Sequence, residues 1–125
     1  MLSKWRKSKD QWFLYLDCRE LDEKQLLEIL DEAAEILKPM TAKVPVMANV
    51  EGTTLSTEFM EKLKQLATEV YAEKVDYSAI VGVSGVKKVL LSSYNFLLKQ
   101  DMRAFNNEEE ALEWIISEHI KDKQN

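Results

Sequence analysis

Three hydroxyl side chains, Thr54, Ser56 and Thr57, stand where a helix is expected to begin after a short apolar strand. A serine at such a place can accept a hydrogen bond from a backbone amide of the first helical turn, so Ser56 is expected to cap this helix. Capping explains the residue by itself, and it is the interpretation that we favour. The alternative is a loop that contacts a protein partner and accepts a phosphate on one of these hydroxyls.

A turn that contains Gly82, Ser84 and Gly85 is the second candidate, and Lys87 follows it closely. The turn is expected at the carboxyl end of a buried strand, where open α/β sheets tend to bind ligands. Backbone amides at the start of the next helix, with the lysine nearby, could hold an anion. The turn matches neither a phosphate-binding loop nor a dinucleotide fingerprint, so a purely structural turn is the favoured interpretation.

The helix expected over 86–98 has more apolar residues than a single core contact needs. Leu91, Tyr94 and Leu98 widen its main apolar stripe sideways. One interpretation is deep burial under the last helix of the chain. The other is an exposed apolar patch that binds a second subunit and so forms a homodimer.

No group of residues indicates catalysis. The chain has one cysteine, Cys18, and one histidine, His119, which excludes an internal disulfide and a structural zinc site built on these residue types. No nucleophile–base pair can be identified near either residue. We therefore expect a protein that is not an enzyme and that uses no metal and no cofactor.

The length and the composition are those expected of a soluble globular protein. The 125 residues fit a single domain over 1–125, and 46% of them are hydrophobic. The net charge of -5 disfavours a nucleic-acid partner, because such binding depends on neutralising phosphates. No apolar run approaches the length of a transmembrane helix, and no apolar segment follows the basic first residues as in a secretory signal. We expect a cytoplasmic protein.

The expected elements alternate along the chain. Two strands, over 1–6 and 11–18, are expected to form a hairpin, and each later strand is followed by a helix. The expected order is β-β-α-β-α-β-α-β-α, which predicts an α/β fold with a mixed, mostly parallel five-stranded sheet and four helices. Asp22 and Gln25 form a capping box at the first helix, and a polar connector is expected over 73–76.

Three segments carry a resemblance to a known family. They are Leu16-Asp17 followed by Glu20-Leu21-Asp22, the strand–loop–helix from Val46 to Leu63, and AIVGVSGVKKVLL with FNNEEEALEWI. With the element order, they resemble the STAS domain, the fold of bacterial anti-sigma-factor antagonists. The chain is most similar to the small stand-alone STAS-like proteins of bacteria, which are mostly uncharacterised. The resemblance covers roughly Gln11 to Ile116.

The resemblance implies a phosphorylated serine at a helix start after the third strand. In the family this serine follows an aspartate and precedes a glycine, whereas here Ser56 and Thr57 have neither neighbour. The implied function is a non-catalytic protein-interaction or regulatory module with an unknown protein partner.

The alternative is a small carrier of an anionic or apolar, lipid-like ligand at the carboxyl ends of the strands. It comes from the comparison often made between STAS domains and the CRAL-TRIO lipid-binding fold. Against it, a chain of 125 residues with four helices is expected to leave little room for a lipid cavity beside a packed core.

Overall fold

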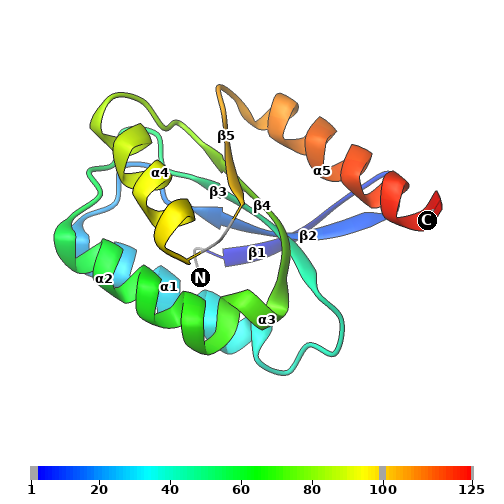
Figure 1. Ribbon diagram of the computed structural model, residues 1–125, viewed down its shortest axis with the longest axis horizontal. Coiled ribbons are helices and arrows are strands. Elements are labelled where there is room, and N and C mark those ends of the chain that lie inside the picture. Colours follow the sequence, from blue (N-terminus) through cyan, green and yellow to red (C-terminus); the bar gives the residue numbers. More distant parts are fainter. Residues whose placement is uncertain (1–2, 99–100, 125) are drawn as a thin grey trace.

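The structure is a computed structural model, and it describes residues 3–98 and 101–124. The elements, in chain order, are β1 (Ser3–Ser8), β2 (Gln11–Asp17), α1 (Glu23–Leu37), β3 (Val44–Asn49), α2 (Thr57–Leu66), η1 (Ala67–Tyr71), α3 (Ala72–Lys74), β4 (Val75–Val81), α4 (Val86–Leu98), β5 (Met102–Phe105) and α5 (Glu108–Gln124). Five strands form one sheet, and helices cover it on both sides (Figure 1).

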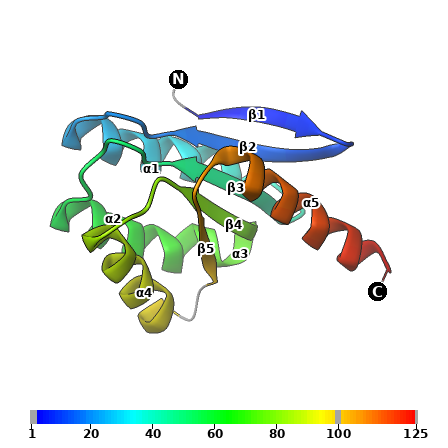
Figure 2. The same cartoon turned by 90° about the horizontal axis from the view of Figure 1, so that it is seen from above.

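The strands lie in the sheet in their sequence order, from β1 to β5. Figure 2 shows this succession, with β1 at one edge and β5 near the other. The pair β1–β2 is antiparallel, and the pairs β2–β3, β3–β4 and β4–β5 are parallel. Each parallel pair is joined by a helical crossover, as such connections require. The predicted α/β architecture is confirmed.

The two faces of the sheet carry different helices. Alternate residues of a strand point to opposite faces, so Leu14 and Leu16 of β2 contact one layer and Phe13 and Tyr15 the other. The first face packs on α1, α2 and α4, and the second on α5 (Figure 1). Because α4 and α5 lie on opposite faces, the expectation that α4 is buried under the last helix is wrong.

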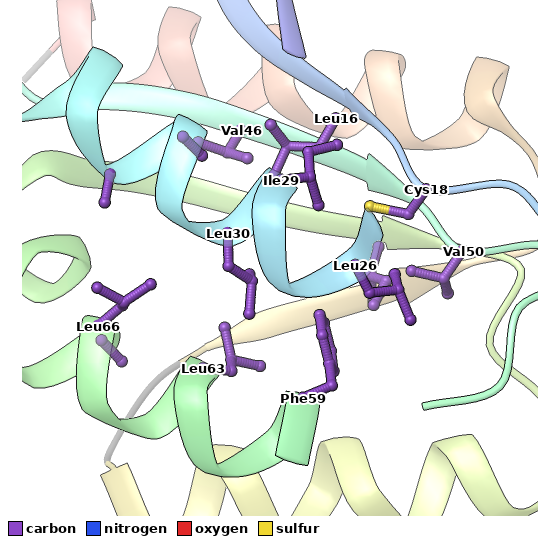
Figure 3. Packing of buried hydrophobic residues seen from close by; sticks show 14 of the residues in the cluster. Leu16, Cys18, Leu26, Ile29, Leu30, Val46, Val50, Phe59, Leu63 and Leu66 are labelled. Carbon is purple, nitrogen blue, oxygen red and sulfur yellow. The ribbon is translucent and has the colours of Figure 1, made fainter. Parts of the chain in front are cut away.

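The first helix begins as its sequence predicts. The carboxylate of Asp22 accepts a hydrogen bond from the Gln25 amide at 2.8 Å, and the Gln25 side chain accepts one from the Asp22 amide at 3.1 Å. This capping box satisfies two backbone donors that a helix start would otherwise leave unpaired. Figure 3 shows Leu26, Ile29 and Leu30 on the face of α1 that packs on the core.

The helix after β3 runs further than expected. A π-helical segment, η1, joins α2 to α3, and β4 begins at Val75 directly after α3. The polar connector expected over 73–76 is therefore wrong. Its polar residues Glu73 and Asp76 are exposed at the end of a helix and the start of a strand, whereas Val75 is half-buried against the core.

Candidate functional site

A cavity of about 310 Å³ lies mainly between the sheet and the helices of the α1, α2 and α4 layer, and its lining also includes Trp114 and Glu118 of α5 on the other side of the sheet. Its walls are mostly aliphatic and aromatic, with Leu16 and Val46 from the sheet and Leu30, Phe59 and Leu63 from the helices. In Figure 3 the side chains of Phe59 and Leu63 project from α2 toward α1 and the sheet. The sequence predicted little room for a lipid cavity beside a packed core, and the structure has a pocket of this volume there.

Polar groups stand at the two ends of this cavity. At the carboxyl ends of the strands, the Lys87 ammonium donates a hydrogen bond to the Val50 carbonyl at 3.1 Å. At the amino ends, the lining includes Asp76, Asp101 and Glu118. Arg103 lines the same end and forms an ion pair with Asp101 at 3.4 Å. The cavity thus has an apolar middle, a lysine at one end and charges of both signs at the other, an arrangement that suits a ligand with distinct polar and apolar parts.

Two irregularities of the backbone border the cavity. The register between β3 and β4 shifts, because Val44 pairs with Val75 and Val46 with Ser78, which leaves Pro45 opposite the two residues Asp76 and Tyr77. A bulge of this kind bends a strand and redirects its side chains. The π-helical segment η1 ends at Tyr71, whose hydroxyl donates to the Leu30 carbonyl at 2.6 Å while the residue lines the cavity. Such segments are often found at functional sites.

Three titratable groups in the apolar part of the cavity, Cys18, Tyr71 and Tyr94, have raised pKa values. Burial, reinforced by the charge of Asp17, raises the pKa of the Cys18 thiol to about 12. Burial raises the pKa of Tyr94 to about 12 and also raises the pKa of Tyr71. A thiol with so high a pKa is a poor nucleophile at neutral pH. This part of the site therefore suits binding better than covalent chemistry.

A second cluster ties α5 to the opposite face of the sheet. The Glu108 carboxylate accepts hydrogen bonds from the Tyr15 hydroxyl, from the Asn49 side-chain amide at 2.7 Å and from Arg6 at 3.2 Å. The Arg6 guanidinium also lies 3.5 Å from the centre of the Tyr15 ring. Burial alone would raise the pKa of Glu108, but the three hydrogen bonds outweigh it and leave this pKa below its ordinary value.

Sequence reasoning missed this cluster because its members lie on four separate elements. Burial, reinforced by the Glu108 carboxylate, raises the pKa of the Tyr15 hydroxyl to about 12. Every donor and acceptor named above is already used within the protein, so the cluster acts as a tie between the β1–β2 hairpin and α5. The one indication in the sequence was Asn49, an uncharged polar residue at the end of an apolar strand.

The Ser56 cap is confirmed. Its hydroxyl oxygen accepts a hydrogen bond from the Phe59 amide at 3.1 Å and lies 3.1 Å from a carboxylate oxygen of Glu23, to which the hydroxyl donates. Thr54 and Ser56 border a shallow polar groove with Glu23, and Thr57 is the first residue of α2. Phosphorylation of these hydroxyls stays a prediction. The neighbouring carboxylates of Glu23 and Glu58 would repel an added phosphate.

The Lys87 amide donates a hydrogen bond to the Ser84 carbonyl at 3.1 Å, but the Lys87 side chain bonds to the Val50 carbonyl rather than to the turn that contains Gly82, Ser84 and Gly85. Ser84 and Gly85 are exposed, whereas the Lys87 side chain lines the cavity and contacts Val50. Gly82 is close to the neighbouring loop, since a Cβ atom on it would lie 2.7 Å from the Glu51 amide nitrogen. Anion binding by the turn amides stays a prediction.

The three residues expected at a dimer interface have different environments. Tyr94 is only 3% exposed and belongs to the core. The prediction that it forms part of an exposed apolar patch is therefore wrong. Its ring fills space next to the cavity, which the sequence pattern could not reveal. Leu91 is half-buried and lines the cavity. The side chain of Leu98 lies outside the described part of the structure.

Within residues 3–98 and 101–124, no three His, Cys, Asp or Glu side chains are placed so that they could hold a metal ion. No helix in the same ranges has an apolar stretch long enough to cross a lipid bilayer.

Comparison with known proteins addresses the fold. No protein-family model matches the sequence, and no curated protein matches it. Among solved structures, the chain is similar to an uncharacterized protein from the DUF3478 family with a SpoIIAA-like fold, from Shewanella loihica PV-4. The TM-score is 0.63 and the sequence identity is 17%, over 90% of each chain. At this identity the likeness establishes only the architecture: the chain has a SpoIIAA-like, STAS-like α/β fold.

Proposed function

We propose that this protein is a non-catalytic binding protein that takes up a small, mostly apolar molecule in the cavity between the sheet and α2. The observation that carries the proposal is the cavity volume of about 310 Å³ behind an apolar lining. An apolar cavity of about 150 Å³ in a protein core can bind benzene, and pockets for small ligands begin near about 300 Å³.

The chemistry of the lining supports binding rather than turnover. The high pKa values of Cys18 and Tyr94 keep both groups protonated at neutral pH. The Tyr71 hydroxyl is already bonded to a backbone carbonyl. A general base needs a pKa near the working pH, and none of these groups has one.

The second candidate is a protein-interaction module that works as a homodimer through α4. The observation that favours it is Val89, which is 65% exposed on a helix whose other described apolar residues are at least half-buried. A lone exposed valine is a small patch, which is why the cavity ranks first. A regulatory partner that contacts the Ser56 loop belongs to this second candidate.

Titration with decanol, an uncharged ten-carbon chain, tests the first candidate. Isotope-labelled protein should show saturable shifts of the amide signals of cavity residues such as Val46 and Leu63. A ligand that binds only the folded state should also raise the melting temperature. Absence of both effects at saturating decanol would remove the proposal.

A filled cavity gives the matched test. Ala48 is half-buried on β3 and lines the cavity, so Ala48→Leu should occupy part of the space and weaken decanol binding. Ala104 is exposed on β5 and does not line it, so Ala104→Leu should bind decanol like the wild type. Equal weakening in both variants would show that the loss is not specific to the cavity.

A further inference from the structure

Lys87 stands at the carboxyl-end side of the cavity, where its ammonium is bonded to a backbone carbonyl. The ammonium group donates to the Val50 carbonyl, and the half-buried side chain shares this wall with Leu55 and Val83. Across residues 3–98 and 101–124, no carboxylate forms an ion pair with Lys87. A carbonyl dipole compensates an ammonium only in part, so a ligand anion placed here would gain a charge-assisted hydrogen bond.

The far end of the cavity carries charges of both signs. The lining there includes Asp76, Asp101 and Glu118, of which Glu118 forms an ion pair with Lys121 at 3.4 Å, and the guanidinium of Arg103. That guanidinium is already shared, because Arg103 forms an ion pair with Asp101 at 3.4 Å and lies 5.3 Å from the centre of the Trp114 ring. Arg103 and Lys121 are thus already paired with carboxylates, whereas the Lys87 ammonium donates to a neutral carbonyl, so an anionic head group is favoured at the Lys87 end of the cavity.

We propose that the ligand is an anionic single-chain amphiphile whose carboxylate head binds Lys87 and whose apolar tail runs between the sheet and α2. This proposal rests on the proposed function, since it requires the cavity to hold an apolar chain. It adds the head-group chemistry and the orientation. It places the anion on the cavity side of Lys87 rather than on the exposed amides of Ser84 and Gly85.

The single charge of Lys87 argues for a carboxylate rather than a phosphate monoester as the head group. A lysine is one point charge, which balances a monoanion, whereas a phosphate monoester near neutral pH carries between one and two negative charges and presents more acceptor oxygens. The neighbouring residue of α4, Lys88, is exposed and does not line the cavity. Lys87 is thus the lysine that reaches a buried head group.

Three ligands, each with a straight chain of ten carbon atoms, test the proposal on the unmodified protein. Calorimetric titration should show decanoate binding about tenfold more tightly than decanol, the effect of one charge-assisted hydrogen bond. Decyl phosphate should bind no more tightly than decanoate. Signals of Val50 and Lys87 should differ between the decanoate and decanol complexes, whereas signals of Asp101 and Arg103 should agree.

Lys87→Met keeps the apolar stem and removes the charge. It should lower the affinity for decanoate about tenfold and leave the affinity for decanol unchanged. Lys88→Met is the matched control on the same helical turn and should change neither affinity. Lys87→Arg restores a cation and should recover most of the preference for decanoate, which separates loss of charge from a general disturbance of α4.

The outcomes separate the two proposals. If none of the three ligands binds, the proposed function fails and the inference falls with it. If decanol and decanoate bind equally, the cavity proposal stands and the carboxylate head at Lys87 is overturned. Tighter binding of decyl phosphate would likewise overturn the carboxylate assignment. Head-group shifts centred on Asp101 would overturn the proposed orientation.

Discussion

The hydroxyl of Tyr15 on β2 donates a hydrogen bond to the carboxylate of Glu108 at the first turn of α5, 93 positions away in the chain. The same carboxylate accepts from Asn49 on β3 and from Arg6 on β1. Three strands are thus tied to one helix through one side chain. The tie also fixes how α5 crosses the face of the sheet that holds Phe13 and Met47.

Removing the Tyr15 hydroxyl should destabilise the fold. Tyr15→Phe leaves Glu108 with two donors, and we expect the free energy of unfolding to fall by about 1.5 kcal/mol, as for a hydrogen bond to a charged group. The control is Tyr77→Phe, since the Tyr77 hydroxyl makes a longer bond of 3.3 Å to a backbone carbonyl. Urea unfolding measures the free energy of unfolding of both variants. Equal losses would show that the bond to Glu108 contributes no more than the bond of Tyr77 to a carbonyl.

Stability should decline on the alkaline side. In the folded protein the pKa of Tyr15 is raised from 10.0 to about 12, so the folded state keeps this proton at a pH where the unfolded chain loses it. The stabilisation is complete below pH 10.0 and is lost as pH rises from there to about 12. Unfolding followed over this range should show a shallower decline for Tyr15→Phe. An unchanged slope would contradict the assignment.

Two glycines with positive φ should respond differently to alanine. Gly82 has φ +88°, and a Cβ atom there would lie 2.7 Å from the Glu51 nitrogen and 2.8 Å from its Cα. Gly85 has φ +55°, and a Cβ atom on it would meet no atom within 4 Å. We expect Gly85→Ala to cost about 1 to 2 kcal/mol and Gly82→Ala at least about 3 kcal/mol. Similar melting temperatures would exclude a steric contact at Gly82.

Substitutions at Ser56 distinguish a helix cap from a phosphorylation switch. Ser56→Ala should cost about 1 kcal/mol, because the Phe59 amide loses its acceptor. Ser56→Asp keeps an acceptor and suits the helix start, but it loses the bond to Glu23 and adds a like charge, so its cost should be smaller than that of alanine without vanishing. Ser92→Ala, on an exposed position of α4, is the control. A kinase that phosphorylates Ser56 stoichiometrically and releases a bound partner would favour the switch.

The α4 dimer is tested by two substitutions on one helix. Leu91→Glu places a charge against the cavity wall and should destabilise the protein whether or not it dimerises. Val89→Glu adds a charge at an exposed position and should leave stability nearly unchanged. Sedimentation should then show a dimer for the wild type and a folded monomer for Val89→Glu if α4 is the interface. A wild type that stays monomeric at high concentration would remove this candidate.

Much of the fold follows from local sequence patterns. Asp22 with Gln25, and Ser56 before Phe59, mark helix starts because a cap needs only residues within one turn. The apolar run before Gly82 predicted a buried strand, because a strand buried on both faces is recognised from consecutive apolar residues. The boundary near Val75 was missed, because the π-helical segment of η1 depends on packing against α1 rather than on its own composition.

By itself, the sequence determined the order of strands and helices and the helix caps, since each depends on residues close together in the chain. That alternating order in turn implied a mostly parallel sheet. Only the tertiary structure decided which helices share a face, that Tyr94 is buried, and that Glu108 joins Tyr15 to Asn49. It also decided that Lys87 turns toward the cavity while Lys88 faces outward. These features depend on contacts between distant segments, because the packing of the helices on the sheet decides which side chains line a cavity.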